Sequence, residues 1–425
     1  MPPPSRLSTL LGAGFASLLA CGAGCSGAKN TLITAIDAGD GSTGSSSGSS
    51  SGGGSGGGSG GGSGGGSGSG SGSGGHEDGG SNDGGACPPC DPGNINLPGS
   101  SCDLDCSGSS SPPGPCDGAL AVDGPAGDFA KALGICQMAS GSSWGLVSGT
   151  YTQGYNTTTA PNAGQHAILP KFGNIIGPHE GTKLGVLSSG YALSCDDPSQ
   201  TATCAASGMG DPYFKGMQTT MDVTPGSAPP GYPKGTTTCA VSPIVADAVG
   251  VTLQIKVPKN VAGLSFDFDF YSSEWPEYVC STYNDQFVAW LQSSAWSGTG
   301  GDLNVSLDSM GNAISVNTPL LDRCTPATPT GCASLLATGT STCSAGPNEL
   351  QGTGFYNLGV YCTTQSTGGA ATGWLTSTAP VAGGETITLQ LIIWDTGDPN
   401  WDSSVLVDNL RWYAASQTVK TTPSP

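Results

Sequence analysis

The sequence predicts an all-β protein, an antiparallel β-sandwich that is jelly-roll-like, with long loops pinned by disulfides. Two segments alternate apolar and polar residues with the period of two that buries one face of a strand, at 251–257 and 264–270. Many short strands separated by Gly, Pro, Asn and Ser favour such a sandwich. Further strand candidates with this punctuation are 285–291, 302–307, 385–394 and 405–412.

One short amphipathic helix is predicted at 128–137, ahead of the main strands. Asp128 is suited to cap its amino terminus, because a carboxylate there accepts hydrogen bonds from free backbone N–H groups. At helical spacing, one face would carry Phe129, Ala132, Leu133 and Cys136.

Composition narrows the class of protein. Of 425 residues, 31 are acidic and 12 are Lys or Arg, for a net charge of −19. Such a chain is repelled by phosphate, so nucleic acid is excluded as a partner, whereas cations are attracted. Glycine is abundant, with 72 residues, but it is concentrated in 41–75, where Thr43 is the one residue other than Gly and Ser.

The amino terminus predicts export and lipid anchoring. Residues 1–20 have one positive charge, Arg6, followed by a 14-residue apolar stretch that suits a lipoprotein signal peptide and is too short to span a bilayer. The stretch ends in LLAC at 18–21, which resembles a bacterial lipobox. Cys21 is therefore the predicted lipidated residue, on a protein facing the exterior from the outer membrane. Cys25 and an ordinary cleavage site are the alternatives.

Four further regions follow the signal peptide. Residues 21–86 are predicted to be a disordered Gly/Ser-rich tether, because they have too few apolar side chains to offset the entropy of ordering. The tether would be a spacer for surface display, or a repeat without a length requirement. A cysteine-rich segment at 87–116 precedes the sandwich domain at 117–413, and 414–425 are predicted to be a flexible tail.

Cysteine usage fits an oxidising compartment. The chain has 16 Cys, and an even number is left without Cys21 and Cys25. Disulfides are expected there, and spacing leaves their pairing open. The first four of these cysteines, in 87–106, also have the outline of a zinc ribbon, which is the alternative. The predicted disulfide cysteines are Cys87, Cys90, Cys102, Cys106, Cys116, Cys136, Cys195, Cys204, Cys239, Cys280, Cys324, Cys332, Cys343 and Cys362.

Several motifs resemble the choice-of-anchor L domain of bacterial surface proteins. They are FDFDFYSSEWPEYVCSTYNDQFVAWL (266–291), GNAISVN (311–317), GTGFYNLG (352–359), TGWLTSTAPV (372–381) and IIWDTGDPNWDSSVLVDNLRW (392–412). Upstream, CDGALAVDG, WGLVSGTY and QHAILPKFG resemble the amino-terminal part of myxobacterial members. The resemblance implies an exported β-rich module, attached to the envelope by various anchors and without established enzymatic activity. An amino-terminal lipid departs from the carboxy-terminal sorting segment of such proteins.

Catalytic groups are sparse. Nucleophilic catalysis by a Ser/His or Cys/His pair needs a base, and of three histidines His76 lies in the tether, while His166 and His179 are expected to be structural. Glu274 and Glu277, three residues apart on one loop, do not obviously flank a scissile bond at the roughly 5–9 Å of glycosidases. We therefore predict a protein that is not an enzyme, with a glycan hydrolase as the less favoured alternative.

Acidic side chains predict one or two calcium sites. Asp395, Asp398, Asn400 and Asp402 place four oxygen side chains in eight residues of a Gly/Pro loop, and Ca²⁺ prefers such oxygen ligands. Asp408 lies in a final strand similar to the last strand of carbohydrate-binding jelly rolls, where an Asp often binds structural calcium. The alternative is that these residues form solvated turns. The candidate ligands are Glu274, Asp285, Asp395, Asp398, Asp402 and Asp408.

Loop aromatics suggest a ligand surface. Such a ring either packs on the core or offers a platform to a sugar ring. The candidates are Trp275, Tyr278, Tyr283 and Trp401. The predicted function is a surface lipoprotein whose sandwich binds extracellular polysaccharide or another surface protein in adhesion. A structural envelope module without a soluble ligand is the alternative.

Overall fold

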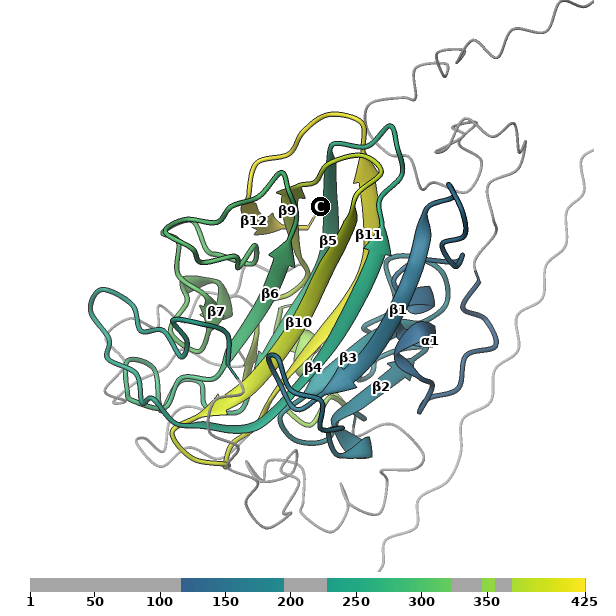
Figure 1. The fold of residues 1–425 in the computed structure, drawn as a ribbon. Helices are drawn as coiled ribbons and strands as arrows, with labels where there is room; N and C mark the ends of the chain where they lie inside the picture. Colours follow the sequence, from purple (N-terminus) through teal and green to yellow (C-terminus); the bar gives the residue numbers. More distant parts are fainter. Residues whose placement is uncertain (1–115, 195–227, 323–345, 356–368, 425) are drawn as a thin grey trace, which may run out of the picture. The chain divides into compact units, whose positions relative to one another are not determined.

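The computed structural model describes residues 116–194, 228–322, 346–355 and 369–424, all within a compact unit that spans Ser81–Pro425 (Figure 1). The predicted signal peptide, Cys21 and the tether lie outside the described residues. So do the predicted disulfide cysteines other than Cys116, Cys136, Cys239 and Cys280.

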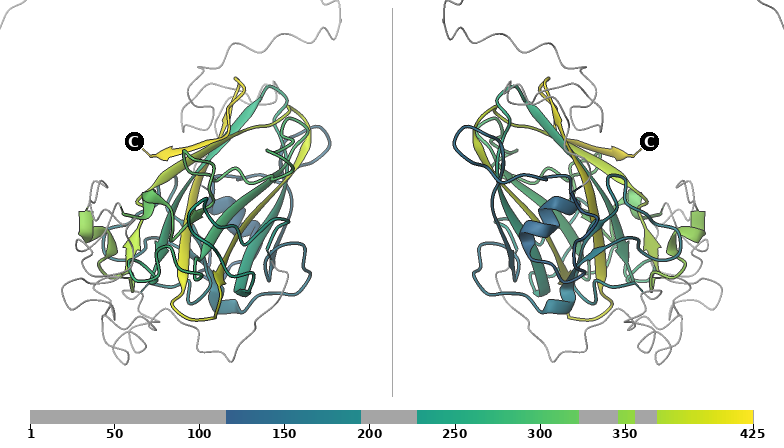
Figure 2. Two further views of the ribbon diagram at one scale, coloured as in Figure 1. Left: turned by 90° about the vertical axis from the view of Figure 1, so that its left-hand side faces the viewer. Right: turned by 90° about the vertical axis from the view of Figure 1, so that its right-hand side faces the viewer.

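Two antiparallel sheets form the fold, and Figure 2 shows their two layers from two sides. The first sheet has the order β1 (Gly145–Thr152), β4 (Val245–Lys256), β10 (Thr386–Thr396), β6 (Gln286–Gln292), β7 (Ile314–Ser315). The second has the order β12 (Lys420–Pro423), β9 (Leu375–Pro380), β5 (Gly263–Ser272), β11 (Ser403–Tyr413), β3 (Leu184–Ser188), β2 (His166–Leu169), and β8 (Ala370–Ala371) pairs with β5. Successive long strands from β4 to β6 and from β9 to β11 alternate between the sheets. The predicted antiparallel sandwich is confirmed.

The central core lies between the sheets and follows the alternation in the sequence. From β4 it takes Val249, Val251, Leu253 and Ile255, which are fully buried. From β5 it takes Leu264, Phe266, Phe268 and Phe270, equally buried. Burial of one face of each strand is the main stabilising contribution, at about 25 cal/mol per Å² of apolar surface.

The outer face of the second sheet is also covered. Tyr271 of β5 and Leu406 of β11 pack there with Phe172, Leu350 and Phe355, which lie outside the strands. This layer also covers the polar side of β5. Asp267 and Asp269 face away from the central core but are buried. A sheet with one free face would leave them in water.

The helix is shorter and starts earlier than predicted. It is α1 (Ala126–Ala132), with Pro125 at the N-cap position instead of Asp128. Asp128 lies in the first turn and pairs with Lys131 at 2.8 Å. The helix ends before Gly134 because that residue has a φ of +92°, a conformation typical of the residue after a helix. The described part of the chain also contains the 3₁₀ helices η1 (Ala163–Gln165), η2 (Pro319–Asp322) and η3 (Gly346–Leu350).

Two further predictions were wrong. Residues 302–307 form isolated bridges and no continuous strand. The physical reason is Asn304, whose side-chain oxygen accepts from the backbone N–H of Ala289 (3.1 Å) and of Ser306 (2.9 Å) and so replaces regular ladder bonds. The predicted tail at 414–425 contains β12, which pairs with β9 at the edge of the second sheet.

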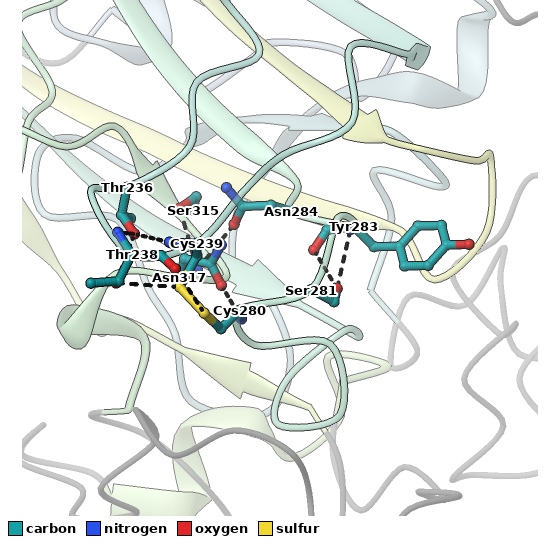
Figure 3. Close-up of a disulfide and its surroundings, with 9 residues drawn as sticks. All are labelled: Thr236, Thr238, Cys239, Cys280, Ser281, Tyr283, Asn284, Ser315 and Asn317. Atoms are coloured by element: carbon teal, nitrogen blue, oxygen red, sulfur yellow. Dashed lines mark hydrogen bonds between the residues drawn. A yellow bond between two sulfur atoms is a disulfide. The ribbon is translucent and has the colours of Figure 1, made fainter.

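Two disulfides join the described cysteines, Cys116–Cys136 and Cys239–Cys280. The second ties the segment before β4 to the loop between β5 and β6 (Figure 3). Around it, the backbone N–H of Cys280 donates to Asn317 Oδ1, and the N–H of Asn317 donates to Asn284 Oδ1 at 3.1 Å. The disulfide therefore restrains a loop that regular strand pairing does not reach.

Among the described residues, no helix is long and apolar enough to cross a bilayer.

We expect the double variant Cys239→Ala/Cys280→Ala to lose about 2–4 kcal/mol of unfolding free energy, because the link closes a long loop in the unfolded chain. The two cysteines are 41 residues apart. Denaturant unfolding of the variant and the parent measures the loss. Both proteins keep the Cys116–Cys136 bond, so both can be unfolded in the same buffer without a reducing agent. An unchanged midpoint with an unchanged slope would show that the loop is held without the disulfide.

Candidate functional site

Three chain segments meet where β10 passes into β11. Loop 397–402 connects these strands, and loop 273–285 connects β5 to β6. The loops are joined by a hydrogen bond from the N–H of Ser273 to the carbonyl of Asp402 (3.2 Å). The third segment is the start of β4, whose register against β10 is interrupted next to Asp247. This end of the sandwich brings together acidic residues from strands β4 and β10 and from the two loops.

Four of the six predicted calcium ligands are buried in this region. Glu274, Asp285, Asp395 and Asp402 have exposed fractions of 3%, 0%, 0% and 1%. The N–H of Asp285 donates to Glu274 Oε2 at 3.3 Å. Asp395 and Asp402 approach a fifth residue, Asp247, with one carboxylate oxygen of each within 4.8 Å of the others. We call these five residues the acidic cluster.

Sequence reasoning missed Asp247. It lies in a bulge of β4 with a φ of +46°, which Asp tolerates better than most residues. Gln165 Nε2 donates to the carbonyls of Asp247 (2.8 Å) and Ser189 (3.1 Å), and so holds the bulge against the segment after β3. The break in alternation at 246–248, with one acid in an apolar run, was the available signal.

Asp285 closes the loop between β10 and β11. Its Oδ1 accepts from the N–H of Thr396 (3.1 Å), the last residue of β10, and its Oδ2 accepts from Ser403 Oγ (2.6 Å), the first residue of β11. Burial raises the pKa of Asp285 to about 8, although both hydrogen bonds favour the charged form. One carboxylate thus fixes both ends of the loop.

Asp395 is placed differently. Neither of its carboxylate oxygens accepts a hydrogen bond from the protein, and the side chain is fully buried. The nearby Ser189 hydroxyl donates to the carbonyl of Ser403 (3.2 Å). Burial, followed by the negative charges of Asp285, Asp402 and Asp247, raises the pKa of Asp395 well above its ordinary value. The Ser189 hydroxyl partly lowers this pKa, but its proton is donated to the Ser403 carbonyl, and the charged neighbours of the carboxylate are acidic.

The other two predicted calcium ligands lie outside the acidic cluster. Asp398 is half-buried, and its Oδ1 accepts from the N–H (3.0 Å) and Nδ2 (3.1 Å) of Asn400 within the loop. Asp408 is five residues along β11 from Ser403, roughly 17 Å at strand spacing. Its oxygens accept from the backbone N–H groups of His179, Glu180 and Asn409.

A pocket of about 290 Å³ adjoins the acidic cluster. Three of the four predicted ligand aromatics line it, and Tyr278 lies edge-on to Tyr283 and to Trp401, each at 5.4 Å between ring centroids. Trp275 is 1% exposed and packs in the central core, so its prediction as a ligand platform is wrong. The lining residues are Glu274, Tyr278, Tyr283, Asp398, Asn400 and Trp401.

Local contacts fix one wall of this pocket. Ser281 Oγ donates to the carbonyl of Tyr283 (3.0 Å) and accepts from its N–H (3.1 Å). Figure 3 shows the Tyr283 ring directed away from the disulfide. Gly397 has a φ of +106°, and a Cβ there would lie 2.6 Å from Cδ1 of Tyr283. The ring therefore packs directly on the glycine backbone.

The glutamates and histidines weighed as catalytic candidates have different surroundings. Glu274 Oε2 accepts from the backbone N–H of Asp285 at 3.3 Å, whereas Glu277 is half-buried. His166 stacks on Tyr151 with ring centroids 3.7 Å apart, and burial lowers its pKa. His179 Nδ1 lies 2.9 Å from a carboxylate oxygen of Asp267 and against Trp374. Both histidines thus have structural contacts.

Residues 246–410 match the family model of the Choice-of-anchor L domain. The resemblance predicted from the motifs is confirmed, and the matched range contains the whole acidic cluster and the pocket. A choice-of-anchor domain indicates a cell-surface protein. Strands β1, β2, β3 and β12 lie outside the matched range but complete both sheets. No curated protein and no solved structure matches the chain.

Substitution of Gly397 tests the packing of the pocket wall. We expect Gly397→Ala to lose about 2–4 kcal/mol, because it combines a left-handed backbone with a clash against Tyr283. The matched control is Gly300→Ala, with a φ of +62° and no atom within 4 Å, for which about 1 kcal/mol is expected. Urea unfolding of both variants measures the difference, and equal losses would show that the Tyr283 ring moves aside freely.

Proposed function

We propose that this protein is a lipid-anchored adhesin of the outer membrane, which binds extracellular polysaccharide without catalysis. The pocket lined by Tyr278, Tyr283 and Trp401 is the observation that carries this proposal. The family match supports the surface location. The proposed lipid on Cys21 supplies the anchor, and the tether carries the sandwich outwards.

The lining chemistry suits a sugar. Aromatic rings offer apolar surface to the C–H groups of a pyranose, while Glu274, Asp398 and Asn400 offer acceptors and a donor to its hydroxyls. The pocket volume of about 290 Å³ is near the lower end of the roughly 300–1,000 Å³ of ligand pockets. It therefore fits one ring of a polymer, and the rest of the chain would lie across the surface.

Charge narrows the class of polysaccharide. Two carboxylates line the pocket, and the whole chain has a net charge of −19. Burial, followed by the negative charges of Asp285, Asp398 and Asp402, raises the pKa of Glu274 well above its ordinary value. A uronate or sulfate group would be repelled. The favoured ligand is a neutral or amine-bearing polysaccharide.

Retention of the full chain on insoluble polysaccharides tests the proposal. We expect binding to cellulose or chitosan and none to alginate, with Tyr278→Ala weakening retention at least about tenfold, or about 1.4 kcal/mol. The matched control is Tyr413→Ala, a half-buried tyrosine at the other end of β11, which should bind as the parent does.

Other outcomes would replace the proposal. Equal retention of Tyr278→Ala and the parent would place binding elsewhere on the surface. Concentration-dependent self-association without retention on any polysaccharide or on whole cells would favour a structural envelope module. Release of soluble sugar that is abolished by Glu274→Gln would favour a hydrolase. Retention on whole cells, abolished by protease treatment of those cells, would favour a surface protein as the ligand.

The anchor has its own test. We expect the full chain, expressed in a bacterium supplied with radiolabelled palmitate, to incorporate the label and fractionate with outer membranes. Cys21→Ala should lose the label and release the protein, because acylation supplies the hydrophobic anchor at roughly 0.8 kcal/mol per buried CH₂. Cys25→Ala is the matched control and should keep both properties. Loss of the label in Cys25→Ala alone would show that Cys25, and not Cys21, is the lipidated residue.

A further inference from the structure

We propose that the carboxylates of Asp247, Asp395 and Asp402 form a binding site for a calcium ion. These three side chains come from the bulge of β4, the end of β10 and the residue before β11. The site shares no residue with the lining of the adjoining pocket, and the proposal stands whether or not a sugar binds there.

The separation of the three carboxylates suits one ion. One oxygen of each lies within 4.8 Å of the others. Ca²⁺ binds oxygen at 2.3–2.6 Å, so two ligands on opposite sides of an ion are about 4.6–5.2 Å apart. At the outer limit of that separation, an ion equidistant from the three oxygens would lie about 2.8 Å from each, so small side-chain adjustments bring all three within Ca²⁺ bonding distance.

Asp395 supplies an independent reason to expect a ligand. Its side chain is fully buried, and both of its oxygens lack a hydrogen-bond donor. The nearby charges of Asp285, Asp402 and Asp247 are negative like its own. A buried carboxylate in such surroundings is costly unless a proton or a cation compensates it. A cation between three carboxylates compensates all of them at once.

The donor set selects calcium among common divalent ions. The acidic, His or Cys side chains that converge here are all carboxylates, whereas zinc sites usually include His or Cys. Mg²⁺ demands near-ideal octahedral geometry at 2.0–2.1 Å and keeps several waters, whereas Ca²⁺ accepts irregular cages with bidentate carboxylates. Asp285 is a positioning residue, because its oxygens already accept from Thr396 and Ser403 at the two ends of the loop.

Thermal unfolding of the full chain tests the site. The protein is stripped with EGTA, dialysed, and melted in CaCl₂, in MgCl₂ and in EGTA. A hundredfold excess of free Ca²⁺ over its dissociation constant should raise the folding equilibrium constant about 100-fold, and MgCl₂ at the same concentration should do less. Equal melting temperatures in CaCl₂ and EGTA would overturn the proposal.

One substitution should change the stability relative to the parent in opposite directions in EGTA and in CaCl₂. A general loss of stability would not produce this reversal. Asp395→Asn removes a ligand and also a buried charge. In EGTA it should be at least as stable as the parent, and in CaCl₂ it should be less stable, with most of the calcium shift gone. Asp395→Asn that keeps the full calcium shift would contradict the site.

Two matched controls replace aspartates whose carboxylate oxygens already accept hydrogen bonds from backbone N–H groups. Asp408 accepts from three backbone N–H groups, and Asp308 accepts from those of Met310 and Asn312. Asp408→Asn and Asp308→Asn should each keep the parent's shift between CaCl₂ and EGTA, whatever their stability. The second control serves if the first fails to fold.

A further pair of variants separates this site from a site within loop 397–402. Tb³⁺ replaces Ca²⁺ in many oxygen sites, and its luminescence is excited through a nearby tryptophan, for which Trp401 stands next to Asp402. Asp247→Asn should lower the affinity for Tb³⁺ at least about tenfold, and Asp398→Asn should leave it unchanged. The opposite result would place the ion in the loop and overturn the proposed ligand set.

Discussion

At the end of the sandwich where β10 passes into β11, the structure depends on how the negative charge of five buried or half-buried carboxylates is compensated. Like charges in a low-dielectric interior repel one another, so each carboxylate needs a hydrogen-bond donor, a proton or a cation. Asp285 is compensated by Thr396 and Ser403, and through them it sets the spacing of the two strands. Asp395 has no such donors. The same fold therefore uses one acid as a clamp and leaves its neighbour available for a ligand.

The pocket is built on this clamp and on the disulfide beside it. Loop 397–402 supplies Trp401, and loop 273–285 supplies Tyr278 and Tyr283. The Cys239–Cys280 bond restrains the second loop, while Gly397 allows the Tyr283 ring to pack against the first. Loops that carry binding residues are usually positioned by a rigid scaffold. In this protein the scaffold is formed by the strands that the two loops connect, β5 and β6 and β10 and β11.

The sheets extend beyond the matched family range in a way that matters to the site. Strand β3, which precedes that range, pairs with β11, and the segment after it places Ser189 against Ser403. Gln165, ahead of β2, holds the bulge that carries Asp247. The upstream strands thus support the acidic cluster from outside the region that the family model matches.

The sequence by itself determined the fold class, because burial of one face of a strand imposes a period of two that is visible at 251–257 and 264–270. It also identified the acids of loop 397–402 by their spacing. Only the tertiary structure decided which acids meet, since Asp247 comes from a bulge about 150 residues earlier and strand pairing is a long-range property. It likewise placed Trp275 in the core and Asp408 in backbone hydrogen bonds, because the direction of a side chain in a loop follows from packing and leaves no periodic signal.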